Sequence, residues 1–154
     1  MSLPDHLTIR WAKFDDLSPQ EVHDCLKLRQ DIFVLEQTSL YADIDGKDPE
    51  ALHCFIKDKA SGALIGAIRA FTGLENGDAR IGRVVIAEDG RGKGLGRALM
   101  LEGIARVEKL APSAKIHITA QSHLEAFYNS LGFDTATAPY DQDGIPHIDM
   151  IRLP

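Results

Sequence analysis

The stretch Gly90-Arg91-Gly92-Lys93-Gly94-Leu95-Gly96-Arg97 (GRGKGLGR) places four glycines among three cations and one leucine. An apolar-rich run typical of a strand, residues 81–87, comes directly before it, and a helical pattern follows. Loops that lead from a strand into a helix N-terminus bind phosphates through converging backbone N–H groups, and glycine allows the close approach. We interpret the stretch as a phosphate-binding loop. The alternative is a surface turn whose charges are merely solvated.

Length and composition set broad limits on the protein class. The chain has 154 residues, a formal net charge of -6, 44% hydrophobic and 26% charged residues. This length suits one domain, residues 1–154, around a single core. No run of 18 apolar residues and no apolar signal segment occurs, so we expect a cytoplasmic protein without a membrane partner. The acidic balance without a basic face argues against a nucleic-acid partner.

The two cysteines, Cys25 and Cys54, lie in a predicted helix and a predicted strand. We expect both to be reduced and packed as small hydrophobic residues, as is usual inside cells, rather than joined in a disulfide.

The first half of the chain is predicted to form a strand, a helix and a hairpin. Residues 7–13 alternate as a strand does, and Ser18 with Pro19 and Glu21 forms a capping box that begins a helix. That helix is predicted to continue as far as Glu36 with an inward stripe formed by Cys25, Leu28, Ile32 and Leu35. An acidic loop follows, and residues 53–57 and 63–71 then predict a hairpin.

The second half alternates helices with strands. The helix after the glycines carries the stripe Met100, Ile104, Val107 and Ala111 and ends at Pro112. Residues 115–121 predict a strand, and Ser122 with Glu125 predicts a second capping box before a helix capped by Gly132. Two last strands are expected near residues 133–139 and 147–153. The order indicates a mixed α/β domain with one layered sheet.

The spacing of the glycines separates this loop from two well-known phosphate motifs. A Walker A loop requires Gly-Lys-Ser/Thr, but Gly94 follows Lys93. The dinucleotide fingerprint requires glycines at relative positions 1, 3 and 6, and starting from Gly90 or Gly92 the last position is Leu95 or Arg97. The pattern that does fit is Arg-x-x-Gly-x-Gly.

This pattern, carried by Arg91, Gly94 and Gly96 directly after a Val-Val-Ile strand, resembles the pyrophosphate motif of the GCN5-related N-acetyltransferase (GNAT) superfamily. A second landmark, a helix with Phe-Tyr-x-x-x-Gly-Phe, is present as residues 127–133. More narrowly, the chain is similar to the ElaA-like branch, through segments 28–37, 41–46, 81–84, 120–124 and 143–150. The resemblance implies a mostly antiparallel central sheet flanked by helices.

The resemblance also implies acetyl-CoA as the acyl donor and assigns its contacts. Backbone amides of Arg91, Gly92, Lys93, Gly94, Leu95, Gly96 and Arg97 would hold the pyrophosphate. Val84, Val85 and Ile86 would line the pantetheine arm, and an N–H near Val85 or Ile86 would stabilise the developing oxyanion. Many relatives carry asparagine and alanine where this chain has Gln121 and Leu124, and Gln121 could still hydrogen-bond the arm.

Tyr128 matches the family tyrosine that protonates the leaving thiolate. It also belongs to the apolar stripe formed by Leu124, Phe127 and Leu131, so the alternative is a core aromatic residue.

The acceptor side is less defined. The base that deprotonates the amine could be Glu36, His53 or His147, and each histidine has a purely structural alternative. Asp43 and Asp45 could position a cationic acceptor. Residues 36–50 hold five acids against Lys47 alone, a lip that would concentrate cationic amines or simply be solvated.

Metal chemistry is not expected. Residues 43–46, Asp-Ile-Asp-Gly, lack the further Asp or Asn that EF-hand spacing requires, and zinc-type His or Cys spacings are absent from the sequence. We therefore expect an acetyl-CoA-dependent N-acetyltransferase with direct transfer to an amine of a small or peptide acceptor, in a possible homodimer. The alternative is a non-catalytic acyl-CoA-binding sensor or interaction module.

Overall fold

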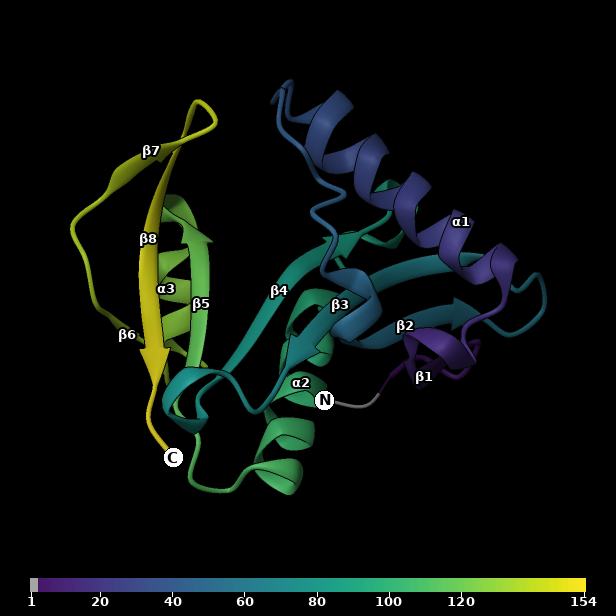
Figure 1. Cartoon of the computed structure of the whole chain (residues 1–154). Helices are drawn as coiled ribbons and strands as arrows, with labels where there is room; N and C mark the ends of the chain where they lie inside the picture. The colour runs from purple at the N-terminus through teal and green to yellow at the C-terminus, as the bar shows by residue number, and fades with distance from the viewer. Residues whose placement is uncertain (1–2) are drawn as a thin grey trace.

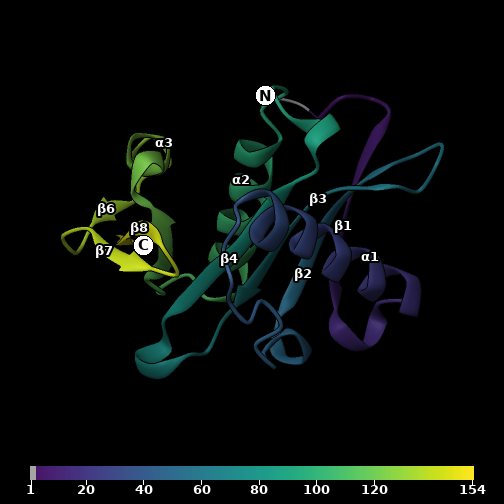
Figure 2. The same cartoon turned by 90° about the horizontal axis from the view of Figure 1, so that it is seen from above.

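A computed structural model describes residues 3–154, which form one mixed sheet with helices on both faces (Figures 1 and 2). The strands follow the spatial order β1-β2-β3-β4-β5-β8-β6, with β7 paired to β8. Their bounds are Leu7–Lys13 (β1), Leu52–Asp58 (β2), Leu64–Phe71 (β3), Ala79–Ile86 (β4), Ile116–Gln121 (β5), Asp134–Thr135 (β6), Tyr140–Gln142 (β7) and Ile145–Arg152 (β8). The expected α/β class with a mostly antiparallel sheet is confirmed.

The sheet opens between β4 and β5. These strands form the sole parallel pair in residues 3–154, and their register contains just two partners, Ala79 with Ile116 and Arg80 with His117. Beyond that point the strands diverge, and Figure 1 shows the gap widening towards their C-terminal ends. Strands that separate leave backbone N–H and C=O groups without ladder partners. The fold therefore creates an unpaired strand edge inside the sheet.

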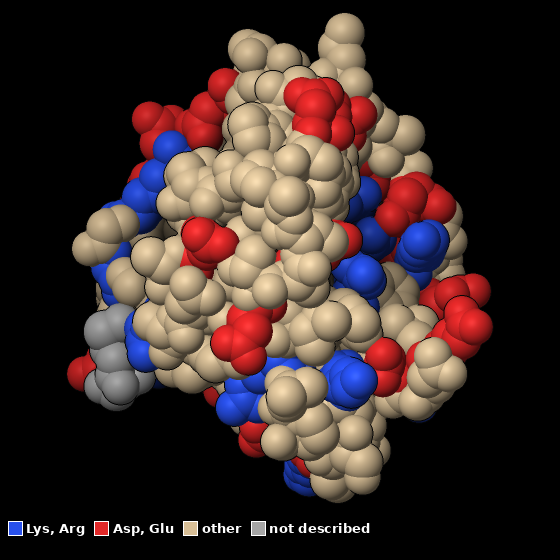
Figure 3. Space-filling model, turned by 90° about the vertical axis from the view of Figure 1, so that its left-hand side faces the viewer, with Lys and Arg blue, Asp and Glu red and all other residues tan. Residues whose placement is uncertain are grey.

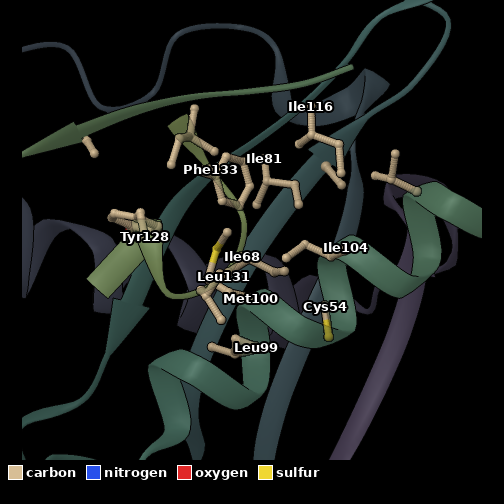
Figure 4. Close-up of a cluster of buried hydrophobic side chains, with 14 of the residues drawn as sticks. Cys54, Ile68, Ile81, Leu99, Met100, Ile104, Ile116, Tyr128, Leu131 and Phe133 are labelled. Atoms are coloured by element: carbon tan, nitrogen blue, oxygen red, sulfur yellow. The ribbon is translucent and has the colours of Figure 1, made fainter. Parts of the chain in front are cut away.

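Three helices cover the sheet: α1 (Pro19–Arg29), α2 (Leu95–Leu110) and α3 (Glu125–Asn129). Helices α1 and α2 pack on opposite faces of β3 and β4 (Figure 2). Alternate strand residues accordingly enter different cores: Ala67 packs with Cys25 on the α1 side, whereas Ile68 packs with Met100 on the α2 side. Figure 4 shows the larger core, and Gly103 brings α2 close to the sheet there, since a Cβ would lie 2.9 Å from Ile81.

The capping box predicted at the start of α1 is confirmed. Ser18 Oγ accepts from the Glu21 N–H at 3.0 Å, and Glu21 Oε1 accepts from the Ser18 N–H at 2.9 Å. The helix does not continue to Glu36, however, because the chain passes into a π-helical segment, Gln30–Glu36. The wider turn rotates Leu35 away from the core, so that 60% of its surface is exposed, and the predicted inward position is wrong.

The elements after β5 differ from the prediction in detail. The second capping box is wrong: residues 122–124 form a 3-10 turn, and α3 begins at Glu125 without a side-chain cap. The strand expected over residues 133–139 shortens to β6, and β7 was not predicted. The β7–β8 turn at residues 143 and 144 and the positive φ of Gly132 agree with the sequence. Cys25 and Cys54 are both buried, in different cores. Across residues 3–154, each helix is too short or too polar to span a bilayer.

Candidate functional site

A cleft of about 870 Å³ follows the opening between β4 and β5. Its walls come from these two strands, the π-helical segment, the loop after it, the start of β8 and α3. Two contacts bridge its halves: Gln121 Nε2 donates to Gln37 Oε1 at 3.2 Å, and Ser39 Oγ donates to the Asp143 carbonyl at 2.8 Å. The cleft is therefore a channel held partly closed by polar contacts between segments distant in sequence.

One end of the cleft leads to the glycine-rich loop. Arg91 lines this end, and residues 92–97 continue beyond it into α2. Gly92 and Gly94 have φ values of 75° and 71°, the left-handed conformation that glycine favours. The N–H groups of residues 92–97 meet no acceptor in the described part of the chain, whereas the Arg91 N–H bonds Glu88. Consecutive free donors at a helix N-terminus form an anion site.

The three cations of this loop differ in exposure and in their partners: Arg91 and Lys93 are exposed, and Arg97 is partly buried. Arg91 Nη2 lies 2.6 Å from Glu36 Oε2, which joins the loop to the π-helical segment. Lys93 Nζ donates to the Asp89 carbonyl, and Arg97 Nη1 donates to Ser130 Oγ. The Arg91 guanidinium lowers the pKa of Glu36 below its usual value. Glu36 therefore stays ionised near neutrality and is a weak base.

The free edge of β4 forms one wall. Val84, Val85 and Ile86 all line the cleft. The Ala87 N–H donates to the Ile65 carbonyl on β3 at 2.7 Å, and antiparallel strands alternate the side towards which residues bond. The N–H of Ile86 therefore points away from β3, into the opening. A bulge lies just before, where Arg83 has φ 51° and the register shifts opposite Ile68.

Tyr128 lies on the opposite wall and is 8% exposed (Figure 4). Its ring meets Phe127 edge to face, with centroids 5.0 Å apart, and Phe133 at 6.2 Å. Burial raises the pKa of the phenol to about 12. The ring belongs to the core, and the side chain also lines the cleft, while its role towards a thiolate stays a prediction.

His147 lines the cleft on β8, opposite Gln121 of β5. Its Nδ1 lies 2.7 Å from the Ile145 carbonyl, which can only accept a hydrogen bond. We assign the proton to Nδ1 on this basis, which leaves the Nε2 lone pair available as a base.

Six charged side chains beside the other end of the cleft form a network that the sequence did not predict, and three of them, Asp45, Arg69 and Arg83, line the cleft itself. Arg29 binds Asp43 and Asp48 at 2.9 and 2.8 Å, Arg69 binds Asp45 and Asp48, and Arg83 binds Asp43 and Asp45. Arg29 is 1% exposed. One signal for Arg29 was available, because it follows Cys25 by four residues and so shares the buried face of α1.

The expectation of an acidic lip that attracts cationic amines is wrong. Asp43 is buried and does not line the cleft, Asp45 does line it, and arginines bind both. The charges of these acids, like that of Glu36, are neutralised by residues distant in sequence. Figure 3 accordingly shows acidic and basic side chains interleaved along the right-hand part of the molecule.

His53 lies outside the cleft, which contradicts its predicted place beside the acceptor. It is 3% exposed, and its Nε2 lies 2.8 Å from the Asp48 carbonyl. Burial lowers its pKa. It faces a smaller cavity between α1 and the segment Asp48–Glu50. Groups of three or more His, Cys, Asp or Glu side chains able to hold a metal ion are absent from residues 3–154.

Comparison with known proteins places this architecture in a family. A family model of the acetyltransferase (GNAT) domain matches residues 14–153. The protein ElaA of Escherichia coli is 35% identical over 147 residues, covering 94% of this chain and 96% of ElaA. A UPF0039 protein of Synechocystis is 37% identical over 145 residues, 94% of each chain.

Solved structures agree with the sequence comparisons. An acyl-CoA N-acyltransferase from Pseudomonas aeruginosa has a TM-score of 0.89 at 34% identity, covering 95% of this chain and 99% of that one. The crystal structure of Escherichia coli ElaA has a TM-score of 0.88 at 32% identity with the same coverage. The chain therefore belongs to the GNAT acyltransferase family, in its ElaA-like branch.

Proposed function

We propose that the protein is an acetyl-CoA-dependent N-acetyltransferase that transfers the acetyl group directly to a primary amine of a small or peptide acceptor. The observation that carries this proposal is the continuity of one cleft. It runs from Arg91, which directly precedes the free N–H groups of residues 92–97, along the unpaired edge of β4 to the Tyr128 side chain. A cytoplasmic location and a homodimer remain predictions.

Acetyl-CoA would bind at the glycine-rich loop and at the open edge of β4, which both have free backbone groups. The N–H groups of residues 92–97 would hold the pyrophosphate, and no atom lies within 4 Å of a Cβ built on Gly92 or Gly96, so an anion has room. Val84, Val85 and Ile86 would contact the pantetheine arm, which would pair with β4 as an added strand does. Gln121 would hydrogen-bond that arm after leaving Gln37.

Three groups would act on the reacting atoms: the Ile86 N–H, His147 and Tyr128. The Ile86 N–H, directed into the opening, would donate to the thioester carbonyl oxygen as negative charge develops there, a contribution of about 3–4 kcal/mol in comparable sites. His147 Nε2 would accept a proton from the acceptor ammonium, which leaves a neutral amine to attack the thioester carbonyl carbon. Glu36, engaged by Arg91, is a poorer base.

Tyr128 would stabilise the leaving sulfur as the carbon–sulfur bond breaks. A thiol has a pKa of about 8.5, so a phenol whose pKa is about 12 does not give up its proton fully to the thiolate. It does donate a hydrogen bond across the whole physiological pH range. The thiolate then takes its proton from the acceptor nitrogen through His147 or from solvent.

Gly96→Asp tests the phosphate site. A carboxylate in the first turn of α2 suits the helix dipole and meets open space, so we expect an unchanged melting temperature. The same carboxylate would repel the pyrophosphate, and we expect at least a 100-fold weaker Kd for coenzyme A by calorimetry. Gln20→Asp, in the first turn of α1 and outside the cleft, is the matched control.

Release of free thiol from acetyl-CoA with a panel of amines completes the test. Release identifies an acetyltransferase, and coenzyme A binding without release on any amine would instead identify a sensor. Unchanged coenzyme A affinity in Gly96→Asp would refute the loop assignment.

A further inference from the structure

The end of the cleft remote from Arg91 has a floor formed by one face of β3 and β4. Phe71 pairs with Arg80, and Arg69 pairs with Gly82, in the antiparallel register. Paired residues and residues two apart share a face, so Arg69, Phe71 and Arg80 lie side by side. The Arg69 guanidinium is 5.3 Å from the Phe71 ring centroid. Lys47, from the loop above, also lines this end.

The carboxylates around this floor have little capacity left for a ligand. Asp45 Oδ1 accepts from the Lys47 N–H and from Arg69, and its Oδ2 faces Arg69 and Arg83. Asp43 and Asp48 are held by the same arginines and by Arg29. Asp143 also lines the cleft, but it lies in the β7–β8 turn beside Ser39, near the end of β5 that is farther from Arg80.

The hydrogen-bonding capacity that remains belongs to cations. Arg80 makes one hydrogen bond, from Nη1 to Thr119 Oγ1 at 3.2 Å, out of the five that a guanidinium can donate. Thr119 in turn donates to Asp149. Within residues 3–154, neither Arg80 nor Lys47 has a carboxylate within 4 Å of its charged nitrogens. This end therefore presents donors where the sequence predicted acceptors.

We propose that the acceptor amine also carries a carboxylate, which Arg80 binds through its free N–H groups with Lys47 nearby, while Phe71 contacts the acceptor's carbon chain. This inference rests on the proposed function and names its substrate class: an amino acid or short peptide rather than a polyamine. Arg80 is six residues from Ile86 along β4, about 20 Å between the Cα atoms. The acceptor therefore needs a spacer between its amine and its carboxylate.

The test compares ω-amino acids with their own carboxamides. The series runs from glycine to 6-aminohexanoate, with triglycine and its amide, and thiol release from acetyl-CoA is measured. The amide removes the negative charge, and in the longer members it leaves the basicity of the distant amine nearly unchanged. We expect kcat/KM to favour the acid by at least 10-fold for the longer members, with glycine the poorest acceptor.

Variants assign that preference to Arg80. Arg80→Gln should raise KM for the best acid 10- to 100-fold, leave KM for its amide unchanged, and leave the melting temperature within a degree or two. Arg80→Lys should restore part of the loss, because it keeps the charge without the bidentate geometry. Lys109→Gln, an exposed charge change on α2 outside the cleft, is the matched control.

The outcomes separate this inference from the proposed function. Turnover of acids and amides with equal kcat/KM, or an unchanged KM in Arg80→Gln, overturns the carboxylate site and leaves the acetyltransferase intact. Turnover of the carboxamides without turnover of the acids also overturns the carboxylate site and leaves the acetyltransferase intact. Coenzyme A binding without thiol release on any member overturns both.

Discussion

Two guanidinium–carboxylate contacts, one buried beside the cleft and one exposed at the glycine-rich loop, use the same chemical groups in opposite ways. Arg29, with 1% of its surface exposed, is enclosed by Asp43 and Asp48. Arg91 and Glu36 meet at 2.6 Å with about two-fifths of each side chain exposed, 43% and 41%. Breaking a buried ion pair leaves a charge without solvation, whereas an exposed pair exchanges its partner for water. Burial therefore decides which pair supports the fold and which can open.

This difference gives the two ends different roles. The buried network ties the loop of residues 43–48 to α1, β3 and β4, and so fixes one wall of the cleft. The exposed pair joins the π-helical segment to the glycine loop, where water can replace either partner without loss of the fold.

Removal of the buried cation should have the largest effect. Arg29→Met keeps most of the side-chain volume but leaves Asp43 and Asp48 with one cation fewer, which should lower the free energy of unfolding by about 3–5 kcal/mol. Urea unfolding followed by circular dichroism measures this change. Lys27→Met, on the exposed side of the same helix, is the control. A loss in Arg29→Met below about 1 kcal/mol would show that the network does not support the fold.

The cluster around Glu21 is of intermediate burial, and its contribution to stability depends on pH. Hydrogen bonds from Arg10, Lys57 and the Ser18 N–H lower the pKa of Glu21 to about 2, against burial that opposes the shift. A depressed folded pKa contributes stability that is present above the unfolded value of about 4.3 and lost as pH falls towards 2. With allowance for solvent screening, we expect about 2 kcal/mol to be lost in that window.

Glu21→Gln isolates this contribution, because glutamine still closes a capping box but has no charge to titrate. The variant should unfold with a shallower dependence on pH between about 4.5 and 2 than the wild-type protein. Parallel curves for the two proteins would contradict the assignment.

Tyr128 lies between the two ends, and its hydroxyl tests the chemistry of the cleft rather than the fold. Tyr128→Phe keeps the ring contacts with Phe127 and Phe133, so the melting temperature should change little. The kcat should fall 10- to 100-fold, since the hydrogen bond to the leaving sulfur is lost. Tyr140→Phe removes a hydroxyl bonded to Asp149, outside the cleft, and should leave kcat unchanged. Equal rates in Tyr128→Phe and wild type would reject the role.

The exposed end should give the smallest effect. Glu36→Gln frees Arg91 from its carboxylate partner, and because both side chains are solvated we expect no measurable shift in the unfolding midpoint. The affinity for coenzyme A should rise, by less than about 10-fold, because Arg91 no longer exchanges one anion for another. Calorimetry checks this outcome. Weaker binding, or a large loss of stability, would mean that Glu36 positions the loop.

Several features of the fold and of the glycine-rich loop could be predicted from residues that are close together in the sequence. Ser18 and Glu21 are three residues apart and cap α1 as predicted, and the glycine-rich stretch of residues 90–97 leads into α2 as predicted, with Gly94 as its N-cap and Gly96 in its first turn. The stripe of Met100, Ile104 and Val107 is buried. These features depend on backbone hydrogen bonds and on helical periodicity, which neighbours within about four residues determine.

The end of the cleft remote from the glycine loop depends on groups that only the fold brings together. Asp43 and Asp48 meet Arg29 across 14 and 19 residues of sequence, and Asp45 meets Arg69 across 24. From the local sequence alone, the same acids are predicted to form a solvated, negatively charged lip. Whether a charge is solvated, paired or available to a ligand is decided by desolvation and by partners from other strands. The sequence alone therefore determined the family, the sheet class and the glycine loop, and the tertiary structure decided how the charges at the opposite end of the cleft are paired.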